Sequence, residues 1–309
     1  RSRFIVGKVL EPVVVRYNEI LRSEGKVDFT DLIVGATALC NANGGGNYDC
    51  IIVDEFQDIS MDRYNFLLAL RRGNPQAQLY CVGDDWQSIY RFSGSDMNLF
   101  CHFDQYFGKT DLNKIETTYR FGNPLVEKSA AFIQRNPAQI RKNIHPFSSD
   151  AKTEIVFREY SRGDAVGALE RIVTEIPLGK SVFLLGRYTY DDYLLAKNFR
   201  QRRSGNSLFY TICGREVEFL TMHRSKGLEA DYVVLLNCNN GSFGFPSTIA
   251  DDPVLGFVMS DSDGYLFGEE RRLFYVAMTR AKVRTIVMYD KSKPSVFVLE
   301  CISPERLAD

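Results

Sequence analysis

The sequence predicts an α/β protein whose chain forms parallel sheets in two domains. Short, nearly continuous apolar runs alternate with segments of helical length, which is typical of parallel strands covered by helices on both faces. A chain of 309 residues is long enough for two domains of ordinary size. Its 45% hydrophobic and 25% charged residues exclude a disordered, collagenous or coiled-coil chain.

Six segments carry apolar residues at helical spacing and are predicted to be helices. They are Val9–Gly25, Asp28–Cys40, Asn123–Arg135, Gly163–Glu175, Asp191–Arg202 and Glu269–Lys282. The second of them begins beside a good N-cap residue, which is either Asp28 or Thr30. The glycine-rich segment 41–47 that follows it is expected to be a loop.

Seven short apolar runs are predicted to be strands. They are Asp49–Val53, Gln78–Val82, Glu154–Phe157, Ser181–Leu185, Val217–Met222, Tyr232–Leu236 and Thr285–Tyr289. A domain boundary is expected near residues 110–118, after which the alternation of strands and helices restarts. Residues 238–268 are rich in Gly, Ser, Asp and Pro and predict a long irregular excursion, which in a compact domain is more often functional than idle.

Charge and cysteine content narrow the class of protein. With 38 basic and 39 acidic residues the formal net charge is −1, which excludes a histone-like polycation but leaves room for a basic groove that binds nucleic acid. The seven cysteines contain no C-x-x-C pair, which predicts buried thiols in a reducing compartment. The apolar runs are far shorter than the ~18 residues of a membrane span, and no signal peptide opens the chain, so we expect a cytoplasmic protein without membrane contact.

Two carboxylates, Asp54 and Glu55, follow the first predicted strand directly. Adjacent carboxylates at the end of a buried strand repel each other and are costly to desolvate. A divalent metal would resolve this conflict, with Asp54 holding Mg²⁺ and Glu55 polarising a water for attack on a phosphoryl group. The alternative is a solvated acidic turn with no function.

The second predicted strand is followed by a segment rich in polar and aromatic residues, Gly83–Gly94. Its polar groups should emerge at the same sheet edge as the two carboxylates, where Gln87 could contact a phosphate oxygen or the attacking water. Tyr90 and Phe92 are candidate platforms for base stacking. The alternative is that these rings belong to the core.

These two segments resemble motifs II and III of superfamily 1 helicases of the UvrD/Rep type, as DEFQD at 54–58 and GDDWQSIYRFSG at 83–94. Four further matches follow the order of the family. They are DFTDL at 28–32, TYR at 118–120 for motif IV, TMHRSKGLE at 221–229 for motif V and EERRLFYVAMTRA at 269–281 for motif VI. The resemblance covers nearly the whole chain and is closest to the C-terminal part of such helicases.

The resemblance implies two RecA-like parallel-sheet domains of the P-loop NTPase fold, the first of them incomplete. Residues 1–27 would be a helical remnant of domain 1B, residues 28–115 the C-terminal part of domain 1A, and residues 116–309 domain 2A. The 2B domain that the family usually inserts between motifs IV and V is expected to be absent or minimal. ATP would bind between the two RecA-like domains.

The resemblance also implies a role for each motif residue, with ATP and Mg²⁺ as cofactors. Asp54 would hold the metal ion, Glu55 would be the general base, Gln87 and Arg120 would sense the γ-phosphate, and Arg280 would be the arginine finger. Tyr119 would stack on adenine, and Glu229 would bind the ribose. The DNA-facing residues would be Tyr90, Phe92, His223, Arg224 and Lys226, where Phe92 replaces the usual tryptophan.

Three of these residues have plainer alternatives. Arg280 could belong, with Arg271 and Arg272, to a solvated charged helix face. His223 could be a satisfied polar residue at a strand end, and Phe92 could be ordinary core.

The sequence also departs from the family pattern. It has no G-x-x-x-x-G-K-[ST] phosphate loop, and its Gly179–Ser181 (GKS) precedes a predicted strand instead of following one, so it is expected to be a turn. The DFTDL segment begins only at residue 28, which predicts that the chain is the back part of a helicase. Ser93 replaces the usual arginine at the end of motif III.

The function implied is an ATP-dependent DNA helicase that moves 3′ to 5′ on single-stranded DNA, acting on single-stranded and partly duplex DNA. Without a phosphate loop this chain alone is expected to be inactive. Its uncovered sheet edge and apolar surface are expected to cause either self-association or mobility of the incomplete domain 1A. Two alternatives stay open: a non-catalytic DNA- or protein-binding domain, and a helicase-nuclease subunit. The second is less favoured because no acidic cluster with nuclease spacing follows motif VI.

Overall fold

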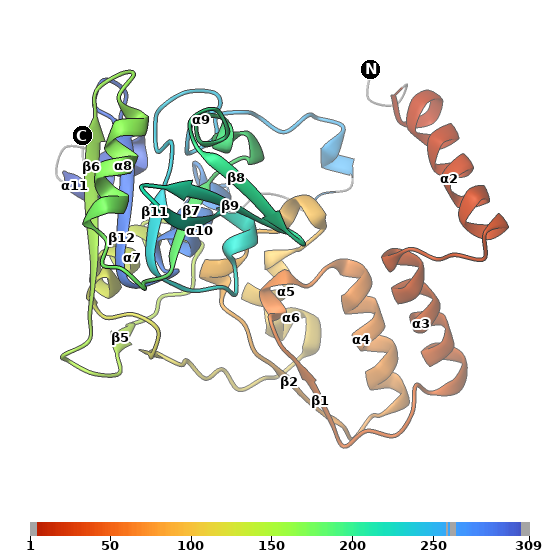
Figure 1. The fold of residues 1–309 in the computed structure, drawn as a ribbon. Helices are drawn as coiled ribbons and strands as arrows, with labels where there is room; N and C mark the ends of the chain where they lie inside the picture. The colour runs from red at the N-terminus through yellow and green to blue at the C-terminus, as the bar shows by residue number, and fades with distance from the viewer. Residues whose placement is uncertain (1–4, 258, 260–263, 304–309) are drawn as a thin grey trace. The chain divides into compact units, whose positions relative to one another are not determined.

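The computed structural model describes residues 5–257, 259 and 264–303. The chain divides into two compact units (Figure 1). Unit 1 comprises residues 1–110 and 250–261, and unit 2 comprises residues 111–249 and 262–309. Each unit has its own sheet and its own hydrophobic core.

Unit 1 begins with helices. A short π-helical segment, η1 (Val6–Leu10), leads into α2 (Glu11–Ser23), and α3 (Phe29–Asn43) follows. Asp28 is the N-cap of α3, because its carboxylate accepts a hydrogen bond from the Asp31 N–H while the Asp31 carboxylate accepts one from the Asp28 N–H. Gly44 ends the helix in the left-handed region that favours glycine, with a φ of 78°.

The sheet of unit 1 contains two parallel strands, β1 (Cys50–Val53) and β2 (Gln78–Cys81), connected through α4 (Met61–Gly73). Short helical segments follow each strand. They are η2 (Phe56–Asp58) after β1, and η3 (Asp85–Gln87), η4 (Arg91–Ser93), α5 (Met97–Cys101) and α6 (Phe103–Phe107) after β2. Both predicted strands are therefore confirmed.

The core of unit 1 lies on one face of this sheet. Ile51 belongs to a cluster with Phe56 and Leu67, and Leu99 is fully buried in it. Because strand residues alternate between faces, Ile52 lies on the other face, where it is 71% exposed. Its partner in the register, Tyr80, is 59% exposed. An exposed apolar sheet face of this kind favours association with a second copy of the chain. Self-association itself stays a prediction.

The main sheet of unit 2 has, within the described part of the chain, eight strands in the order β4-β6-β12-β11-β7-β10-β9-β8. Their bounds are Asn123–Pro124 (β4), Lys152–Tyr160 (β6), Ala281–Asp290 (β12), Ala230–Leu235 (β11), Val182–Gly186 (β7), Arg215–Thr221 (β10), Ser207–Ile212 (β9) and Arg200–Ser204 (β8). The strands from β4 to β10 are parallel, and β9 and β8 continue the sheet in antiparallel orientation. A separate parallel pair joins β3 (Thr117–Thr118) to β5 (His145–Pro146).

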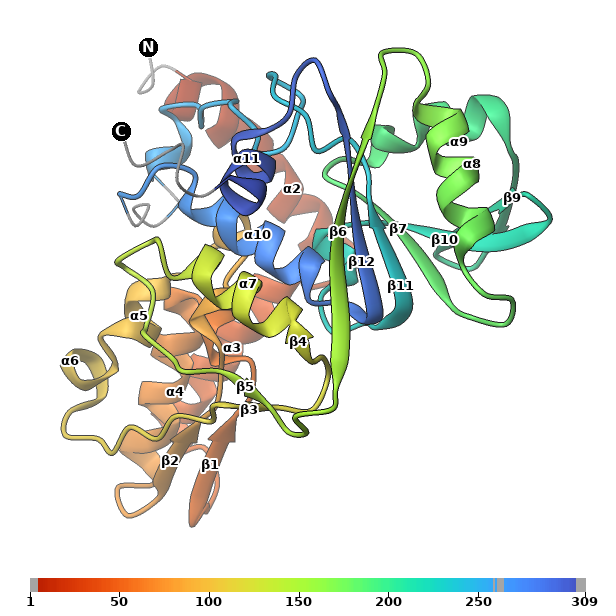
Figure 2. The same ribbon diagram turned by 90° about the vertical axis from the view of Figure 1, so that its left-hand side faces the viewer.

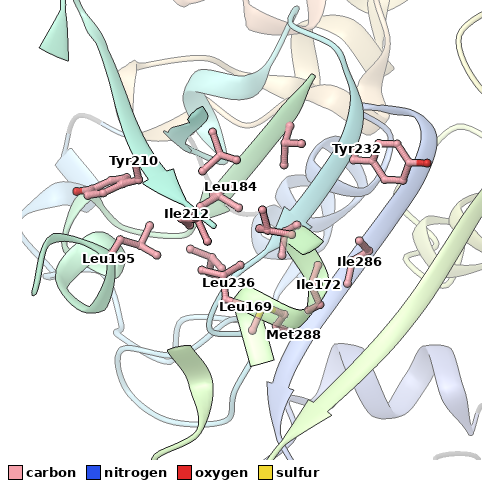
Figure 3. Packing of buried hydrophobic residues seen from close by; sticks show 14 of the residues in the cluster. Leu169, Ile172, Leu184, Leu195, Tyr210, Ile212, Tyr232, Leu236, Ile286 and Met288 are labelled. Atoms are coloured by element: carbon pink, nitrogen blue, oxygen red, sulfur yellow. The ribbon is translucent and has the colours of Figure 1, made fainter. Parts of the chain in front are cut away.

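Helices cover both faces of this sheet (Figure 2). On one face lie α7 (Leu125–Ile133), α10 (Gly268–Met278) and α11 (Val296–Ile302), and on the other lie α8 (Ala165–Glu175) and α9 (Tyr193–Asn198). Leu169 and Ile172 of α8 pack with Met288 in the larger core (Figure 3). The RecA-like α/β architecture is thus confirmed.

Two predicted helices end four residues earlier than expected. The helix predicted over 191–202 is wrong in its second half, since α9 ends at Asn198 and residues 200–204 form the edge strand β8. Pairing with β9 and the bidentate ion pair of Arg202 with Glu216 override the local helical pattern. The helix predicted over 269–282 ends at Met278, because the chain turns there to enter β12.

Two smaller expectations also have an outcome. Gly179–Ser181 is a turn, as expected: Gly179 has a φ of 80°, and the Ser181 N–H and hydroxyl both donate to the Asp231 carboxylate at 3.0 Å. All seven cysteines are free, but Cys50 and Cys213 are exposed, so the expectation of uniformly buried thiols is wrong.

Candidate functional site

The chain turns sharply where β1 ends, and this turn presents the two predicted carboxylates. Glu55 has a left-handed φ of 50°, and its N–H donates to Asp54 Oδ1 at 2.8 Å. A non-glycine residue in this region is strained, and such strain is concentrated at functional sites. Both side chains are exposed, so the desolvation argument for a metal does not hold. The strained, solvent-facing turn is the feature that favours a site here.

Gln57 joins this turn to the one after β2. Its side chain is completely buried, its Nε2 donates to Glu55 Oε2 at 2.5 Å, and its Oε1 accepts from the Asp84 N–H at 2.9 Å. At Gly83 a Cβ would lie 2.5 Å from Gln57 Oε1 and 2.7 Å from the Phe100 ring, so only glycine admits the amide at this place. Gln57 was not among the site residues predicted from the sequence, although it lies inside the DEFQD segment.

The residues after β2 continue this hydrogen-bond network. Gln87 Nε2 donates to Asp84 Oδ2 at 2.6 Å, so Glu55, Gln57, Asp84 and Gln87 form one chain of polar contacts. Unit 1 therefore brings the predicted base and the predicted phosphate sensor into one network.

The two predicted stacking residues lie beside this network. Tyr90 and Phe92 meet edge to face, with ring centroids 6.0 Å apart. Phe92 is 61% exposed, which excludes the alternative that it is a core residue. Burial, together with the negative charges of Asp58 and Glu55, raises the pKa of the Tyr90 hydroxyl, so it stays a neutral phenol.

The turn after β1 suits a magnesium ion in its chemistry. Mg²⁺ prefers oxygen ligands and is usually held by one or two carboxylates, several waters and substrate phosphates. Asp54 offers an exposed carboxylate of this kind. The described residues contain no group of three or more His, Cys, Asp or Glu side chains that could hold a metal. A single exposed carboxylate of this kind fits an ion that is shared with a phosphate ligand.

In unit 2, three predicted nucleotide-contacting residues lie at the amino edge of the parallel sheet. Arg120 precedes β4, Glu229 directly precedes β11, and Arg280 directly precedes β12. Arg120 Nε donates to Glu229 Oε1 at 2.7 Å, and the Ala230 N–H donates to the Arg280 carbonyl at 3.1 Å. The sheet therefore brings together residues that are up to 160 positions apart in the sequence.

Lys282 also contacts this group and was not predicted. Its Nζ lies 3.0 Å from Glu229 Oε2. Burial pulls the pKa of Glu229 upward, but the hydrogen bonds from Lys282 and Arg120 outweigh it and hold the pKa below its usual range. Glu229 is consequently an anion, which can accept hydrogen bonds from hydroxyl groups.

Tyr119 forms an exposed aromatic stack beside Arg120. It follows β3 and stacks on Phe147, which follows β5, with centroids 4.5 Å apart and rings inclined by 29°. Tyr119 is 76% and Phe147 is 67% exposed, so the outer ring faces are open to solvent. Phe147 is a second ring that was not predicted from the sequence, because only the pairing of β3 with β5 brings it there.

Arg280 is buried and is not part of a helix. Its Nε donates to the Val276 carbonyl at 2.8 Å, and its Nη2 donates to Thr279 Oγ1 at 3.1 Å. Arg271, Arg272 and Arg280 are 1–4% exposed, so the alternative of a solvated charged face is wrong. Arg271 is instead held by Glu300 at 2.7 and 2.9 Å, and Arg272 by Gln139 at 3.1 Å.

The predicted DNA-facing residues of unit 2 lie at the opposite, carboxyl edge of the same sheet. His223 and Arg224 belong to η6 (His223–Ser225), which follows the end of β10, and Lys226 comes next. Arg187 follows β7, the neighbouring parallel strand, and pairs with Glu270 at 2.7 Å. Burial and the positive charge of Arg187 lower the pKa of His223 to about 4, so this imidazole is neutral at physiological pH.

Fold and motifs together define a class of protein: RecA-like domains of the P-loop NTPase fold. Residues 7–108 match the model of the UvrD/REP helicase N-terminal domain, and residues 201–292 match that of the UvrD-like helicase C-terminal domain. The chain belongs to the UvrD/Rep family of DNA helicases.

Relatives agree with this assignment. DNA helicase IV of Escherichia coli K12 is 34% identical over 293 residues, which cover 94% of this chain and 41% of that protein. A probable DNA helicase of Mycoplasma pneumoniae is 25% identical over 278 residues, which cover 86% of this chain and 49% of that one. The chain thus spans less than half the length of these relatives.

Among solved structures, the C-terminal domain of a possible DNA helicase from Lactobacillus plantarum WCFS1 is similar over 60% of this chain and 96% of that one, with 14% identity and a TM-score of 0.35. In the described part of the chain, no helix has the length and hydropathy that crossing a membrane requires.

Proposed function

We propose that this chain carries the ATP- and DNA-contacting residues of a helicase that moves 3′ to 5′ along single-stranded DNA. Unit 1 would act on Mg²⁺ and the terminal phosphate through Asp54, Glu55 and Gln87. Unit 2 would contribute Arg120 and Arg280. Single-stranded and partly duplex DNA would be the substrates.

The observation that best supports this proposal is that the candidate ATP-contacting residues and the candidate DNA-contacting residues of unit 2 lie at opposite edges of its sheet. Arg120, Glu229 and Arg280 lie at the amino edge, with the exposed ring of Tyr119 beside them. His223, Arg224 and Lys226 lie at the carboxyl edge. A domain that couples hydrolysis to movement needs two separate ligand surfaces linked by a rigid element, and parallel strands provide such a link.

The chemistry assigned to unit 1 follows from its hydrogen bonds. Bound Mg²⁺ would neutralise charge on the phosphate oxygens. Glu55 would accept a proton from the attacking water, and the buried Gln57 amide fixes one oxygen of that carboxylate at 2.5 Å. Gln87, held by Asp84, would contact the γ-phosphate. Positioning of the reacting groups supplies most of the catalysis in phosphoryl transfer, so a carboxylate held in a fixed position would increase the rate of hydrolysis.

A non-catalytic DNA-binding role is the second candidate for the chain by itself. It is favoured by one feature of the sequence, which is that these 309 residues contain no G-x-x-x-x-G-K-[ST] segment. In that case the carboxyl edge of unit 2 and Phe92 would still bind DNA.

DNA binding is tested by titrating a labelled single-stranded oligonucleotide with the chain and following its anisotropy. We expect binding that weakens as salt rises, since basic side chains displace counterions from the phosphates. Phe92→Ala should weaken binding by roughly 1–3 kcal/mol while the melting temperature stays unchanged, because a stacked base is lost from an exposed ring.

Tyr48→Ala is the matched control, since Tyr48 is 51% exposed in the same unit and lies outside every family motif. Absence of binding at low salt would refute the DNA-binding proposal. Equal weakening by both substitutions would remove Phe92 from the site.

A further inference from the structure

Unit 2 contains a cavity of about 450 Å³ to which none of the helicase motifs contributes a residue. It lies beside the carboxyl ends of β6, β11 and β12, between these strands and the helices α8 and α9. Its floor is formed by Leu169, Leu236 and Met288, which belong to the hydrophobic core (Figure 3). A cavity of this size is large enough for a small organic ligand.

The walls of the cavity are aromatic. Four rings line it, from Tyr160, Tyr190, Tyr193 and Phe243, and the last three of them are 48%, 66% and 62% exposed. The rings of Tyr190 and Phe243 are inclined by 82° with centroids 5.9 Å apart, so they form a corner that is open to solvent. The face of an aromatic ring attracts cations, and several rings around one site are typical of proteins that bind organic ammonium ions.

The charge of the cavity lining is negative. Among the described residues that line it, Asp191 is the only charged side chain, and none is Lys, Arg or His. The nearby guanidinium of Arg187 donates to the Glu270 carboxylate at 2.7 and 2.9 Å, so its positive charge is already compensated. The rings and the carboxylate together therefore select a ligand that carries a positive charge.

The Asp191 carboxylate is held in a fixed position. Its Oδ2 accepts from the Tyr188 N–H at 2.8 Å, its Oδ1 accepts from Asn237 Nδ2 at 3.0 Å, and the Arg187 backbone donates a further hydrogen bond. A carboxylate has about four acceptor positions, so one stays open to a ligand. Burial raises the pKa of this carboxyl against the effect of these hydrogen bonds, and a cation bound beside it would stabilise its ionised form.

We propose that this cavity binds a small organic amine in its protonated form. The apolar body of the amine would lie on the core residues of the floor, and its ammonium group would lie between the Asp191 carboxylate and the rings of Tyr190 and Phe243. A neutral apolar ligand would leave the carboxylate without a counter-charge, and an anion would be repelled by it. The inference goes beyond the proposed helicase function, because it uses no motif residue.

The test compares ligands of similar size that differ in charge. They are 2-phenylethylamine, which is protonated at neutral pH, the neutral 2-phenylethanol and the anionic 3-phenylpropanoate. NMR titrations of the ¹⁵N-labelled chain measure each dissociation constant from the amide signals of cavity residues such as Tyr193 and Asn237. Nα-acetyl-lysine methylamide is a further ligand, which carries the same charge on a protein side chain.

Variants of the lining relate this binding to the cavity. Asp191→Asn removes the charge while keeping the shape, Phe243→Leu removes an exposed ring, and Ala165→Trp fills the cavity. Leu178→Ala is the control, since Leu178 is 91% exposed in the turn before β7, at the other edge of the sheet. Melting curves establish that each variant is folded, and Phe243→Leu decides the question if Asp191→Asn does not fold.

We expect the unaltered chain to bind 2-phenylethylamine roughly tenfold more tightly than 2-phenylethanol, and to bind 3-phenylpropanoate most weakly. Asp191→Asn should reduce this preference for the amine to about twofold or less. Phe243→Leu should reduce it by roughly two- to fivefold, because one ring that attracts the cation is lost. Ala165→Trp should abolish binding of the amine, and Leu178→Ala should leave it unchanged.

Equal binding of the amine and the alcohol by the unaltered chain would overturn the proposal, as would a preference for the amine that survives in both Asp191→Asn and Phe243→Leu. Tighter binding of Nα-acetyl-lysine methylamide than of 2-phenylethylamine would overturn the assignment to a free amine and indicate a protein side chain instead. Each of these outcomes leaves the proposed helicase function in place, because DNA binding tests that function separately.

Discussion

At the scale of single residues, the Gln57 side chain joins the turn after β1 to the turn after β2 through two hydrogen bonds. It is buried in a place where only an amide satisfies both neighbours, because Glu55 requires a donor and the Asp84 N–H requires an acceptor. A carboxylate would repel Glu55, and an apolar residue would leave the Asp84 N–H without its acceptor. The identity of the residue is therefore fixed by two hydrogen bonds of opposite sense.

Gln57→Leu should lower the free energy of unfolding by about 1–3 kcal/mol, the typical cost of an unsatisfied buried polar group. Urea unfolding of the chain, followed by the fluorescence of the single tryptophan, measures this change. Gln105→Leu is the control on an exposed glutamine of the same unit and should stay within about 0.5 kcal/mol of the parent. Equal stability of the two variants would show that the Gln57 amide contributes nothing.

His223 gives a prediction about pH. Its pKa is lowered from 6.5 to about 4 in the folded chain, so between these values the unfolded state binds a proton that the folded state does not. The free energy of unfolding should therefore fall as pH decreases through this window, by up to about 1.4 kcal/mol per pH unit from this residue.

Urea unfolding of the parent and of His223→Gln at several pH values between 7.5 and 4 measures the effect. In the variant the free energy of unfolding should fall less steeply between pH 6.5 and 4, since glutamine does not titrate. Identical slopes in the two proteins would mean that the imidazole is accessible to protons in the folded state.

At the scale of elements, α11 is held to unit 2 by a buried ion pair in addition to apolar packing. Arg271 of α10 donates to both oxygens of Glu300 of α11, and its guanidinium lies over the Phe132 ring of α7 at 4.4 Å. The Arg271 and Glu300 side chains are 4% and 9% exposed. The conspicuous arginines of motif VI therefore include one whose contacts are those of a structural residue.

Glu300→Ala should destabilise unit 2 by roughly 3–5 kcal/mol, because it leaves the Arg271 guanidinium buried without its carboxylate. Glu175→Ala breaks the exposed pair with Arg158, whose side chains are 54% and 48% exposed, and should cost less than about 1 kcal/mol. Thermal unfolding of both variants makes the comparison. Similar losses would show that burial of the Arg271 pair has no energetic consequence.

At the scale of the whole molecule, the candidate groups are divided between two units that each fold around a core of their own. Unit 1 contributes the carboxylates and Gln87, while unit 2 contributes the arginines and the Tyr119–Phe147 stack. Neither unit contains the glycine-rich phosphate loop whose backbone N–H groups hold the β- and γ-phosphates in enzymes of this fold. Without that cradle we expect a nucleotide to have no fixed position on this chain.

The purified chain should therefore hydrolyse no ATP, even with saturating single-stranded DNA and Mg²⁺. A phosphate-release assay with and without DNA measures this directly. DNA-stimulated turnover above about 1 s⁻¹, within the ordinary range of enzymes, would contradict the prediction and would mean that other groups hold the phosphates.

The sequence by itself determined the fold class, the family and most strand positions, because these depend on local patterns: apolar runs, turn residues and contiguous motifs. Asp54, Glu55, Gln87 and the motif V residues could be selected in this way. Local pattern failed where tertiary pairing decides the conformation, as at Arg200–Ser204, whose helical periodicity gave way to pairing with β9.

Only the tertiary structure decided which distant residues meet. Phe147 reaches Tyr119 through the pairing of two short strands, and Lys282 reaches Glu229 because β11 and β12 are neighbours in the sheet. It also decided burial, placing Arg280 inside and Ile52 in solvent. Both follow from the same physical cause: strand order and packing are properties of the whole sheet, and no short stretch of sequence contains them.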